Sequence, residues 1–338
     1  MRDGYKIIAV TAAGRRQYMK FLVPHILNSD IIDQYDIWVN TINKFDIAFF
    51  KELAARYPKI KLVYQPDKLI NGIASINSFY KYCIEPKSIY LKLDDDIIWM
   101  DDNALSTLVD FRINNPKYFL ISPVVINNGL CAYALYNSGK LKLNRYLKAY
   151  MEDVAGWCTP EFSEKYHRWF YDILINERTE DVMINNKEIA MNRFSINAVL
   201  FFGSSFREFS GEVVGDDEEF LSVVRPTQLG CSNCFVGNSI MVHYAFSSQK
   251  KHLDKTDILN LYDRYYSDKK KSYYEEVCSI ISMVEHMDNI EDYMIGLDYK
   301  FVEGDLKSKL GSKKFYFPVK KRFYEFYIDK CRPINLKW

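Results

Sequence analysis

The sequence has no uninterrupted apolar run near the ~20 residues that a membrane-spanning helix needs. It also has no secretory signal pattern: the early apolar run IIAVTAA is followed by basic GRR, whereas a signal peptide carries its basic residues first. We therefore expect a first β-strand here, in a protein that is cytoplasmic or peripheral on the inner face of a membrane.

An excess of one charge sign is also missing, because 45 Lys and Arg residues nearly balance 44 Asp and Glu residues. The net charge of the whole chain therefore gives no argument for a nucleic-acid partner, and only a local basic patch would provide one. Two phosphate-binding motifs are absent, G-x-G-x-x-G after the first strand and G-x-x-x-x-G-K-[ST] anywhere. If the chain binds a pyrophosphate, cations must neutralise it.

The seven cysteines are few, scattered and odd in number, which indicates reduced thiols rather than a disulfide framework. Cys231 and Cys234 form a C-x-x-C pair, and a zinc site would need two more ligands. His243 and His252 offer spacings unlike those of zinc fingers or ribbons, so we favour loop or core thiols over zinc.

What is present is an alternation of strand-like and helix-like segments through the first 125 residues. The strand-like segments are 6–10, 35–41, 58–65, 88–93 and 118–126, and the helix-like ones are 14–29, 45–57, 71–83 and 102–115. Pro24 is expected to kink or interrupt the first helix. The pattern predicts an α/β fold, a mostly parallel sheet flanked by helices, which binds ligands at the carboxyl ends of its strands.

Three parts follow from this pattern: a nucleotide-binding half at 1–126, an acceptor half at 127–250, and a helical C-terminal extension at 251–338. Residues 127–195 are irregular and suit an insertion that shapes a pocket. The extension ends in a tail in which Lys313, Lys314, Lys320, Lys321 and Arg322 alternate with aromatic residues. Such a tail suits an anionic membrane surface, a solvated helix face or a protein contact.

Three consecutive aspartates follow the strand-like SIYLKL, in the sequence KLDDDI. Strand alternation sends Asp94 and Asp96 to one side and Asp95 to the other. Carboxylate oxygens suit Mg²⁺ or Mn²⁺, which complete their shells with water and phosphates. A helix-capping cluster is the structural alternative; an EF-hand is disfavoured because Ile98 and Trp99 stand at ligand and glycine positions.

A second acidic group, GDDEEF, contains Asp217 and precedes a helix-like segment, where acids are also favoured by the helix dipole alone. His243 lies in the apolar IMVHYAFSS; a lone histidine in such a run is more often a hydrogen-bonded core residue than a ligand.

In this order the pieces resemble the GT-A family of nucleotide-sugar glycosyltransferases. KLDDDI resembles the family's D-x-D motif, GDDEEF its acidic motif about 120 residues later, and His243 its late metal-binding histidine; the resemblance covers residues 5–250. It implies Asp94 and Asp95 on the nucleotide side, with Asp94, Asp96 and His243 around Mn²⁺ or Mg²⁺. It also implies Asp217 as the catalytic base.

The resemblance further implies nucleotide contacts after the first strands. TAAGRR supplies Thr11, Ala13 and Arg15, and Asn40 follows the second strand. Asn77, which interrupts an apolar helix face, is a further nucleotide candidate or a sign of simple helix polarity.

The implied function is metal-dependent transfer of a sugar from a nucleotide sugar to a glycan or lipid-linked acceptor, with a UDP-sugar as the preferred donor. Asp217 would act as the base, and the anomeric configuration would invert. Trp157, His167 and Trp169 are candidates for an acceptor platform, with core packing as the alternative. A nucleotidyltransferase using the same aspartates and a non-catalytic sugar- or nucleotide-binding module are the rival functions. A two-metal nuclease is disfavoured because no basic track is evident.

Overall fold

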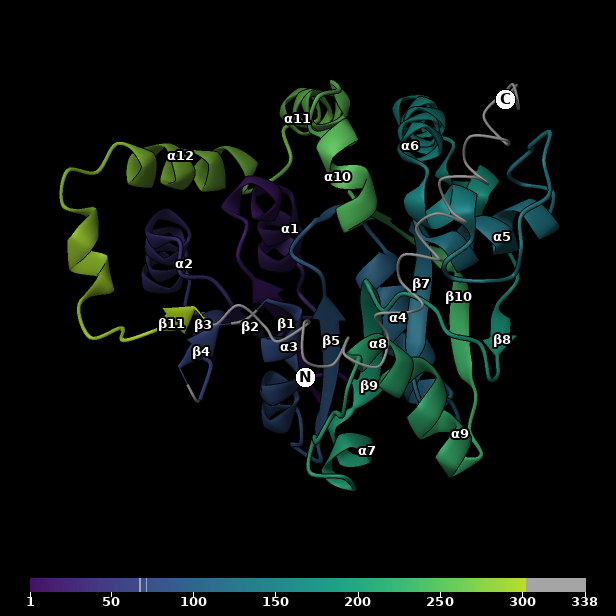
Figure 1. Cartoon of the computed structure of the whole chain (residues 1–338), viewed down its shortest axis with the longest axis horizontal. Coiled ribbons are helices and arrows are strands. Elements are labelled where there is room, and N and C mark those ends of the chain that lie inside the picture. The colour runs from purple at the N-terminus through teal and green to yellow at the C-terminus, as the bar shows by residue number, and fades with distance from the viewer. Residues whose placement is uncertain (67, 71, 302–338) are drawn as a thin grey trace, which may run out of the picture.

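The computed structural model describes residues 1–66, 68–70 and 72–301. In this part of the chain, nine strands form one sheet in the order β3-β2-β1-β5-β9-β7-β10-β6, with β8 beside β10 (Figure 1). Their bounds are β1 Lys6–Ala13, β2 Gln34–Val39, β3 Ile60–Tyr64, β5 Ser88–Leu93, β6 Ile97–Met100, β7 Ile121–Ile126, β8 Lys187–Ile189, β9 Ala198–Phe202 and β10 Asn233–His243. The predicted α/β sheet flanked by helices is confirmed.

The first half of the sheet is parallel: β1 pairs with β2 and β5, and β2 pairs with β3. Helices α1 (Arg16–Asn28) and α2 (Lys44–Arg56) connect these strands. Pro24 lies inside α1 without interrupting it. The predicted helix at 71–83 is instead a short α3 (Ile73–Ile76) that continues as the 3₁₀ helix η1 (Asn77–Tyr82).

The second half of the sheet is mixed because β9 and β6 run against their neighbours. A direct strand-to-helix connection after the aspartates was predicted, but β6 intervenes before α4 (Ala104–Asn114). The aspartates form a tight turn, in which the Ile97 amide donates to the Asp94 carbonyl at 3.2 Å. All four residues of β6 are buried, which explains their unbroken apolar sequence.

Residues 127–195, predicted as an irregular insertion, combine helices with irregular stretches such as 138–153, and only β8 joins the sheet. Here and in the following segment the elements are α5 Gly129–Asn137, the π-helix η2 Val154–Cys158, α6 Pro160–Ile175, η3 Thr179–Val182, α7 Gly203–Arg207, α8 Asp217–Glu219, η4 Phe220–Val224 and α9 Arg225–Leu229. The segment with the second acidic group is therefore a chain of short helical turns.

The described part of the C-terminal extension, which ends at residue 301, is mainly helical, as predicted. It comprises α10 Ser247–Leu253, α11 Ile258–Asp268, α12 Tyr274–Glu285, η5 Ile290–Met294 and the short strand β11 Lys300–Phe301. Helix α12 packs on α1 and α2 (Figure 1), and Arg16 pairs with Glu285 at 2.7 Å. Strand β11 pairs with β4 (Leu69–Ile70) of the first half.

The predicted boundary at residue 250 falls inside α10, so no break in structure separates the extension there. The basic aromatic tail lies outside the described residues. Within the residues that the structure describes, no helix is both long and apolar enough to cross a membrane.

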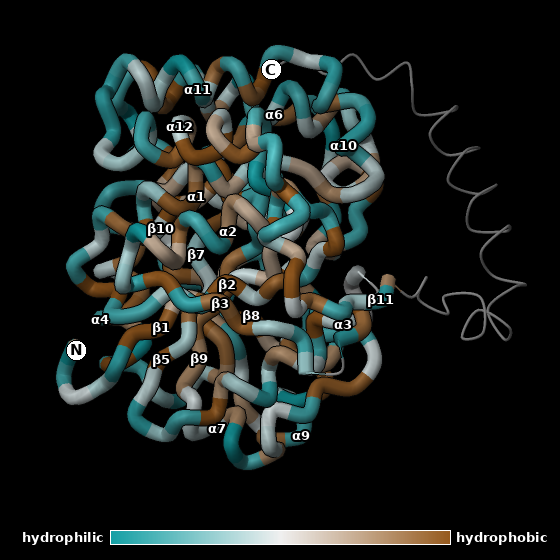
Figure 2. Tube along the Cα trace, turned by 90° about the vertical axis from the view of Figure 1, so that its left-hand side faces the viewer, coloured by the Kyte–Doolittle hydropathy of each residue, from teal (hydrophilic) through white to brown (hydrophobic). Residues whose placement is uncertain are grey.

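The core is continuous along the sheet. Every residue of β5, β7 and β9 is buried, and Figure 2 shows hydrophobic segments concentrated on the central strands. The cysteines of the described chain are free thiols, as expected. The group of potential metal ligands found in that part of the chain includes neither Cys231 nor Cys234, in keeping with core or loop thiols.

Candidate metal and nucleotide site

The candidate site lies at one edge of the sheet, where several strand ends meet. Strands β1, β5, β7 and β10 share one direction, so their carboxyl ends lie at the same edge. Strand β9 runs the other way, so its amino end, next to Asn197, lies there too. This topology gathers side chains from residues 15 to 243 into one place.

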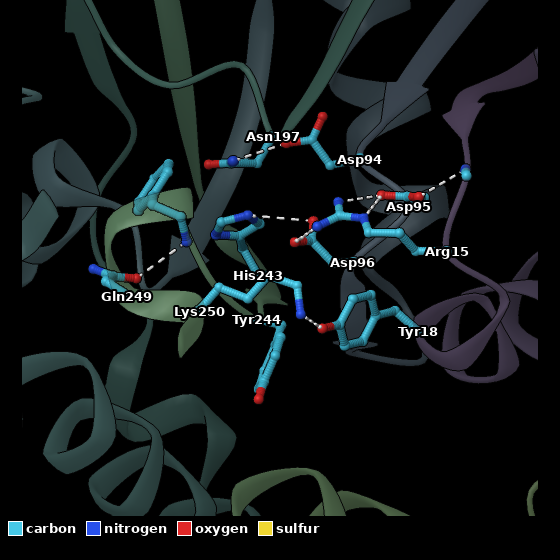
Figure 3. Close-up of polar contacts among 12 residues, drawn as sticks. Arg15, Tyr18, Asp94, Asp95, Asp96, Asn197, His243, Tyr244, Gln249 and Lys250 are labelled. Carbon is cyan, nitrogen blue, oxygen red and sulfur yellow. Dashed lines mark hydrogen bonds and ion pairs between the residues drawn. The ribbon is translucent and has the colours of Figure 1, made fainter. Parts of the chain in front are cut away.

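Asp94, Asp96 and His243 form a potential metal-binding group, with one ligand atom from each lying within 4.8 Å of the others. Asp95 points elsewhere: its carboxylate accepts from the Gly14 amide at 3.0 Å and from Arg15 Nε at 2.9 Å (Figure 3). The structure thus groups Asp94 with Asp96, as the alternation predicted, although the three residues form a turn and Arg15 contacts both Asp95 and Asp96.

An irregularity in the pairing of β10 with β6 positions His243. The register shifts between Val242 and His243, which leaves Ile98 out of the ladder. His243 Nδ1 lies 3.4 Å from the Asn127 carbonyl, and Nε2 lies 3.3 Å from Asp96 Oδ1. With the proton on Nδ1 directed to Asn127, the Nε2 lone pair faces the aspartates, as in a metal-binding histidine.

Asn127 adopts a left-handed backbone, with φ +63°, directly after β7. Its side-chain amide donates to the Tyr244 carbonyl at 2.7 Å and to Gln249 at 3.0 Å, and accepts from Ser163 at 2.9 Å. These bonds hold the strained backbone that presents the carbonyl to His243.

The protein itself supplies cations to the aspartates. Arg15 Nη1 lies 3.1 Å from Asp96 Oδ2, while its Nε and Nη2 bond Asp95. Burial alone would lower the pKa of Arg15, but Asp96 and Asp95 raise it above its ordinary value.

Lys92 and Asn197 complete the set around Asp94, and sequence reasoning missed both. Buried Lys92 bonds Asp94 Oδ1 and donates to the Ile196 carbonyl at 2.9 Å. Asn197 Nδ2 donates to Asp94 Oδ2 at 2.9 Å. Lys92 carries a sequence signal, since it is a charge within an apolar strand two residues before the aspartates; Asn197 carries none.

The donor set fits a hard divalent cation. Asp96 is 1% exposed, and its Oδ1 accepts no hydrogen bond from the described residues. Burial alone would raise the pKa of Asp96, but His243 and Arg15 hold it well below the usual range, so the carboxylate is ionised. Carboxylate oxygens with one imidazole nitrogen suit Mn²⁺ or Mg²⁺.

The second acidic group lies in and just before α8. Asp217 is 8% exposed and accepts a hydrogen bond from the Tyr80 hydroxyl at 3.0 Å. Burial raises its pKa, and the charge of Lys92 opposes this. Lys92 thus acts electrostatically on both Asp94 and Asp217.

The neighbours of Asp217 have different environments. Asp216 is exposed, caps α8 through the Glu219 amide at 3.0 Å, and pairs with Arg193 at 3.1 Å. Burial raises the pKa of Glu218 to about 7, against the charge of Arg193, which it contacts at 2.9 Å. Glu218, which the sequence did not single out, is therefore a second titratable acid beside the predicted base.

The predicted nucleotide contacts differ in how far their side chains are exposed. Thr11 and Ala13 are fully buried in β1, so their side chains lie within the sheet, whereas the Arg15 side chain is 36% exposed. Asn40 donates to the Gly72 carbonyl at 3.2 Å, and Asn77 donates to the Gly215 carbonyl at 2.9 Å.

Gly14 lets the loop after β1 approach the loop after β2. A Cβ at this position would lie 3.3 Å from the Asn40 carbonyl oxygen and 3.3 Å from Thr41 Cβ. The two loops named as nucleotide contacts therefore lie against each other.

Tyr18 and Lys250 extend the site beyond the predicted residues. The Lys250 ammonium donates to the Tyr18 hydroxyl at 2.6 Å (Figure 3). It also pairs with Asp254 at 2.5 Å. Arg15 and Lys250 both lie 5.2 Å from the centre of the Tyr18 ring. One aromatic ring thus holds two cations beside the aspartates.

The predicted acceptor platform is wrong for His167. It is fully buried, with Nε2 2.8 Å from the Tyr244 carbonyl, because α6 turns it into the core. Trp169 packs on Tyr166, and the Trp157 carbonyl accepts from Ser248 at 2.7 Å; both tryptophans are partly buried.

No family model matches the sequence, and no curated protein matches it. Among solved structures, the chain is similar to GalNAc-T7 with UDP, GalNAc and Mn²⁺ (12% identity, TM-score 0.44, 92% of this chain and 58% of that one). It is also similar to residues 1–349 of S. aureus TarS (8% identity, TM-score 0.41, 80% and 74%). A third is CMP:2-keto-3-deoxy-manno-octonic acid synthetase with CTP (10% identity, TM-score 0.42, 77% and 99%). These similarities concern architecture only.

Proposed function

We propose that this protein is a metal-dependent glycosyltransferase. In this proposal it moves a sugar from a nucleoside-diphosphate sugar to a hydroxyl of a glycan or lipid-linked acceptor. A UDP-sugar is the preferred donor. The observation that carries the proposal is the grouping of Asp94, Asp96 and His243 within 4.8 Å at the carboxyl edge of the sheet. An open α/β sheet binds its ligands at this edge.

Asp96 and His243 would hold Mn²⁺ or Mg²⁺, with Asp94 as a further ligand or a ribose contact. When bound, the ion would stabilise the negative charge that develops on the departing nucleoside diphosphate. Arg15 and Lys250, gathered on Tyr18, are cations of this chain that can bind the same diphosphate. They would replace the backbone cradle that the sequence lacks.

Asp217 would accept the proton of the acceptor hydroxyl as it attacks the anomeric carbon from the face opposite the leaving group, which inverts the configuration. Its burial supports this role, because a raised pKa brings a carboxylate closer to the ideal strength of a general base near neutral pH. The Tyr80 hydroxyl orients the carboxylate through one of its oxygens.

The first test is thermal unfolding of the full chain with UDP, GDP, CDP and their sugars, each with Mn²⁺ or with EDTA. We expect one nucleoside diphosphate to raise the melting temperature when Mn²⁺ is present, and the shift to disappear in Asp96→Asn. Asp102→Asn is the matched control, since Asp102 belongs to the same acidic stretch but is exposed and pairs with Lys271 at 2.7 Å.

Product analysis separates the proposed reaction from its rivals. A glycosyltransferase releases a nucleoside diphosphate from the nucleotide sugar, whereas a nucleotidyltransferase consumes a nucleoside triphosphate and releases pyrophosphate. Stabilisation by a nucleotide without either product would favour a binding module. No stabilisation by any nucleotide would contradict the proposed donor site.

A further inference from the structure

Each of the three aspartates has a basic side chain of the protein as its partner. Asp94 bonds Lys92, Asp95 bonds Arg15, and Asp96 lies next to both Arg15 and His243. Asp95 and Asp96 are 4% and 1% exposed, so unpaired charges there would be costly. The three adjacent acids therefore have charge partners within the chain itself.

Arg15 is shared between two carboxylates in an unequal way. Its Nε and Nη2 both bond Asp95 Oδ1, and the Gly14 amide donates to the other oxygen of Asp95 at 3.0 Å. Only Nη1 reaches Asp96, at 3.1 Å. The guanidinium thus makes two contacts with Asp95 and one with Asp96, so loss of the single contact leaves Asp95 paired.

A metal ion on Asp96 and the Nη1 group of Arg15 would share one carboxylate, with Nη1 at Oδ2 and with Oδ1 open beside His243. Both are cations, and two like charges a few ångströms apart in a mostly buried site repel each other strongly. The ion pair with Nη1 also lies at one oxygen of Asp96, Oδ2. The metal must therefore either displace Arg15 from Asp96 or bind in spite of the repulsion between the two cations.

We propose that Arg15 is a resident counter-ion that occupies Asp96 in the metal-free protein, competes with the divalent cation, and withdraws from Asp96 when the cation binds. The inference rests on the metal site of the proposed function. After withdrawal, Nη1 is free beside the metal, where the next negative group to arrive is the diphosphate of the donor. Metal and nucleoside diphosphate should then each tighten the binding of the other through this one side chain.

Titration calorimetry of Mn²⁺ into the metal-stripped full chain tests the competition. We expect Arg15→Gln to bind Mn²⁺ about tenfold more tightly than the wild type, because the competing charge is gone. We expect Arg15→Lys to lie between the two, because an ammonium keeps the charge but cannot bridge both carboxylates.

Arg16→Gln is the matched control. Arg16 is the adjacent arginine and also pairs with a buried aspartate, Asp46, at 2.8 Å, but it contacts none of the three clustered aspartates. Its loss should lower the melting temperature and leave the Mn²⁺ affinity unchanged.

A second measurement uses the coupling with UDP, or with whichever nucleoside diphosphate stabilises the protein. In the wild type it should tighten Mn²⁺ binding, and in Arg15→Gln most of that gain should be lost. If Arg15→Gln binds Mn²⁺ no more tightly than the wild type, Arg15 does not compete and the inference is wrong, although the metal site stands. If none of the variants binds Mn²⁺, both the inference and the proposed metal site are wrong. Should Arg15→Gln fail to fold, Arg15→Lys decides by the same comparison.

Discussion

At the residue scale, Asp217 is subject to opposing effects: burial raises its pKa, while Lys92 and the Tyr80 hydroxyl lower it. The base must be ionised to accept a proton. Turnover should therefore fall as the pH falls through the pKa of Asp217, and this acid limb should lie above ~3.9, the ordinary pKa of an aspartate.

Tyr80→Phe tests this assignment through the pH–rate profile. Losing the hydroxyl removes a hydrogen bond to the ionised form, so the pKa of Asp217 should rise and the acid limb should move to higher pH. Asp217→Asn should lower kcat by ~10²–10⁴-fold and leave donor binding largely intact. Asp216→Asn, at the exposed neighbour, is the control. If Glu218→Gln lost turnover and Asp217→Asn did not, Glu218 would be the base.

At the element scale, the connection from β7 to α5 holds His243, the proposed metal ligand, through Asn127. Asn127→Ala should lower the free energy of unfolding by ~1–3 kcal/mol, because three buried hydrogen bonds are lost and alanine disfavours φ +63°. Mn²⁺ affinity should also fall, since the carbonyl that orients His243 shifts.

Urea unfolding and Mn²⁺ titration check this expectation, with Asn137→Ala as the control. Asn137 is exposed at the C-terminal end of α5. A stable Asn127→Ala protein with wild-type Mn²⁺ affinity would show that the connection does not position His243.

At the scale of the whole molecule, the described part of the helical extension packs on the first half of the fold. Ile280 of α12 is fully buried, and α12 contacts α1 and α2. Ile280→Ala should lower the free energy of unfolding by ~2–5 kcal/mol. If the extension and the sheet unfold as one unit, Ile280→Ala should shift a single thermal unfolding transition. Calorimetry checks this, with Ile295→Ala at an exposed position as the control. Two transitions, of which only one moves, would mean that the extension unfolds separately.

Much of the first half of the fold could be predicted because its elements are encoded locally. Alternating apolar segments and helical spacing mark β1, α1, β2, α2, β3 and β5. The acidic triplet after β5 and the acids before η4 are visible for the same reason, since charged residues beside apolar runs need a partner. Strand β6 was missed because four apolar residues after a turn are too short a pattern to distinguish a strand from a loop.

By itself, the sequence determined the strand-helix order of the first half and the position of Asp94, Asp95 and Asp96 at the end of a strand, because these features depend on neighbouring residues. Only the tertiary structure decided which distant groups meet them. The antiparallel pairing of β9 brings Asn197 to Asp94, the shifted register of β10 turns His243 to Asp96, and the close approach of β1 gives Asp95 and Asp96 to Arg15. Strand pairing depends on burial summed over the whole sheet, and no local pattern carries that sum.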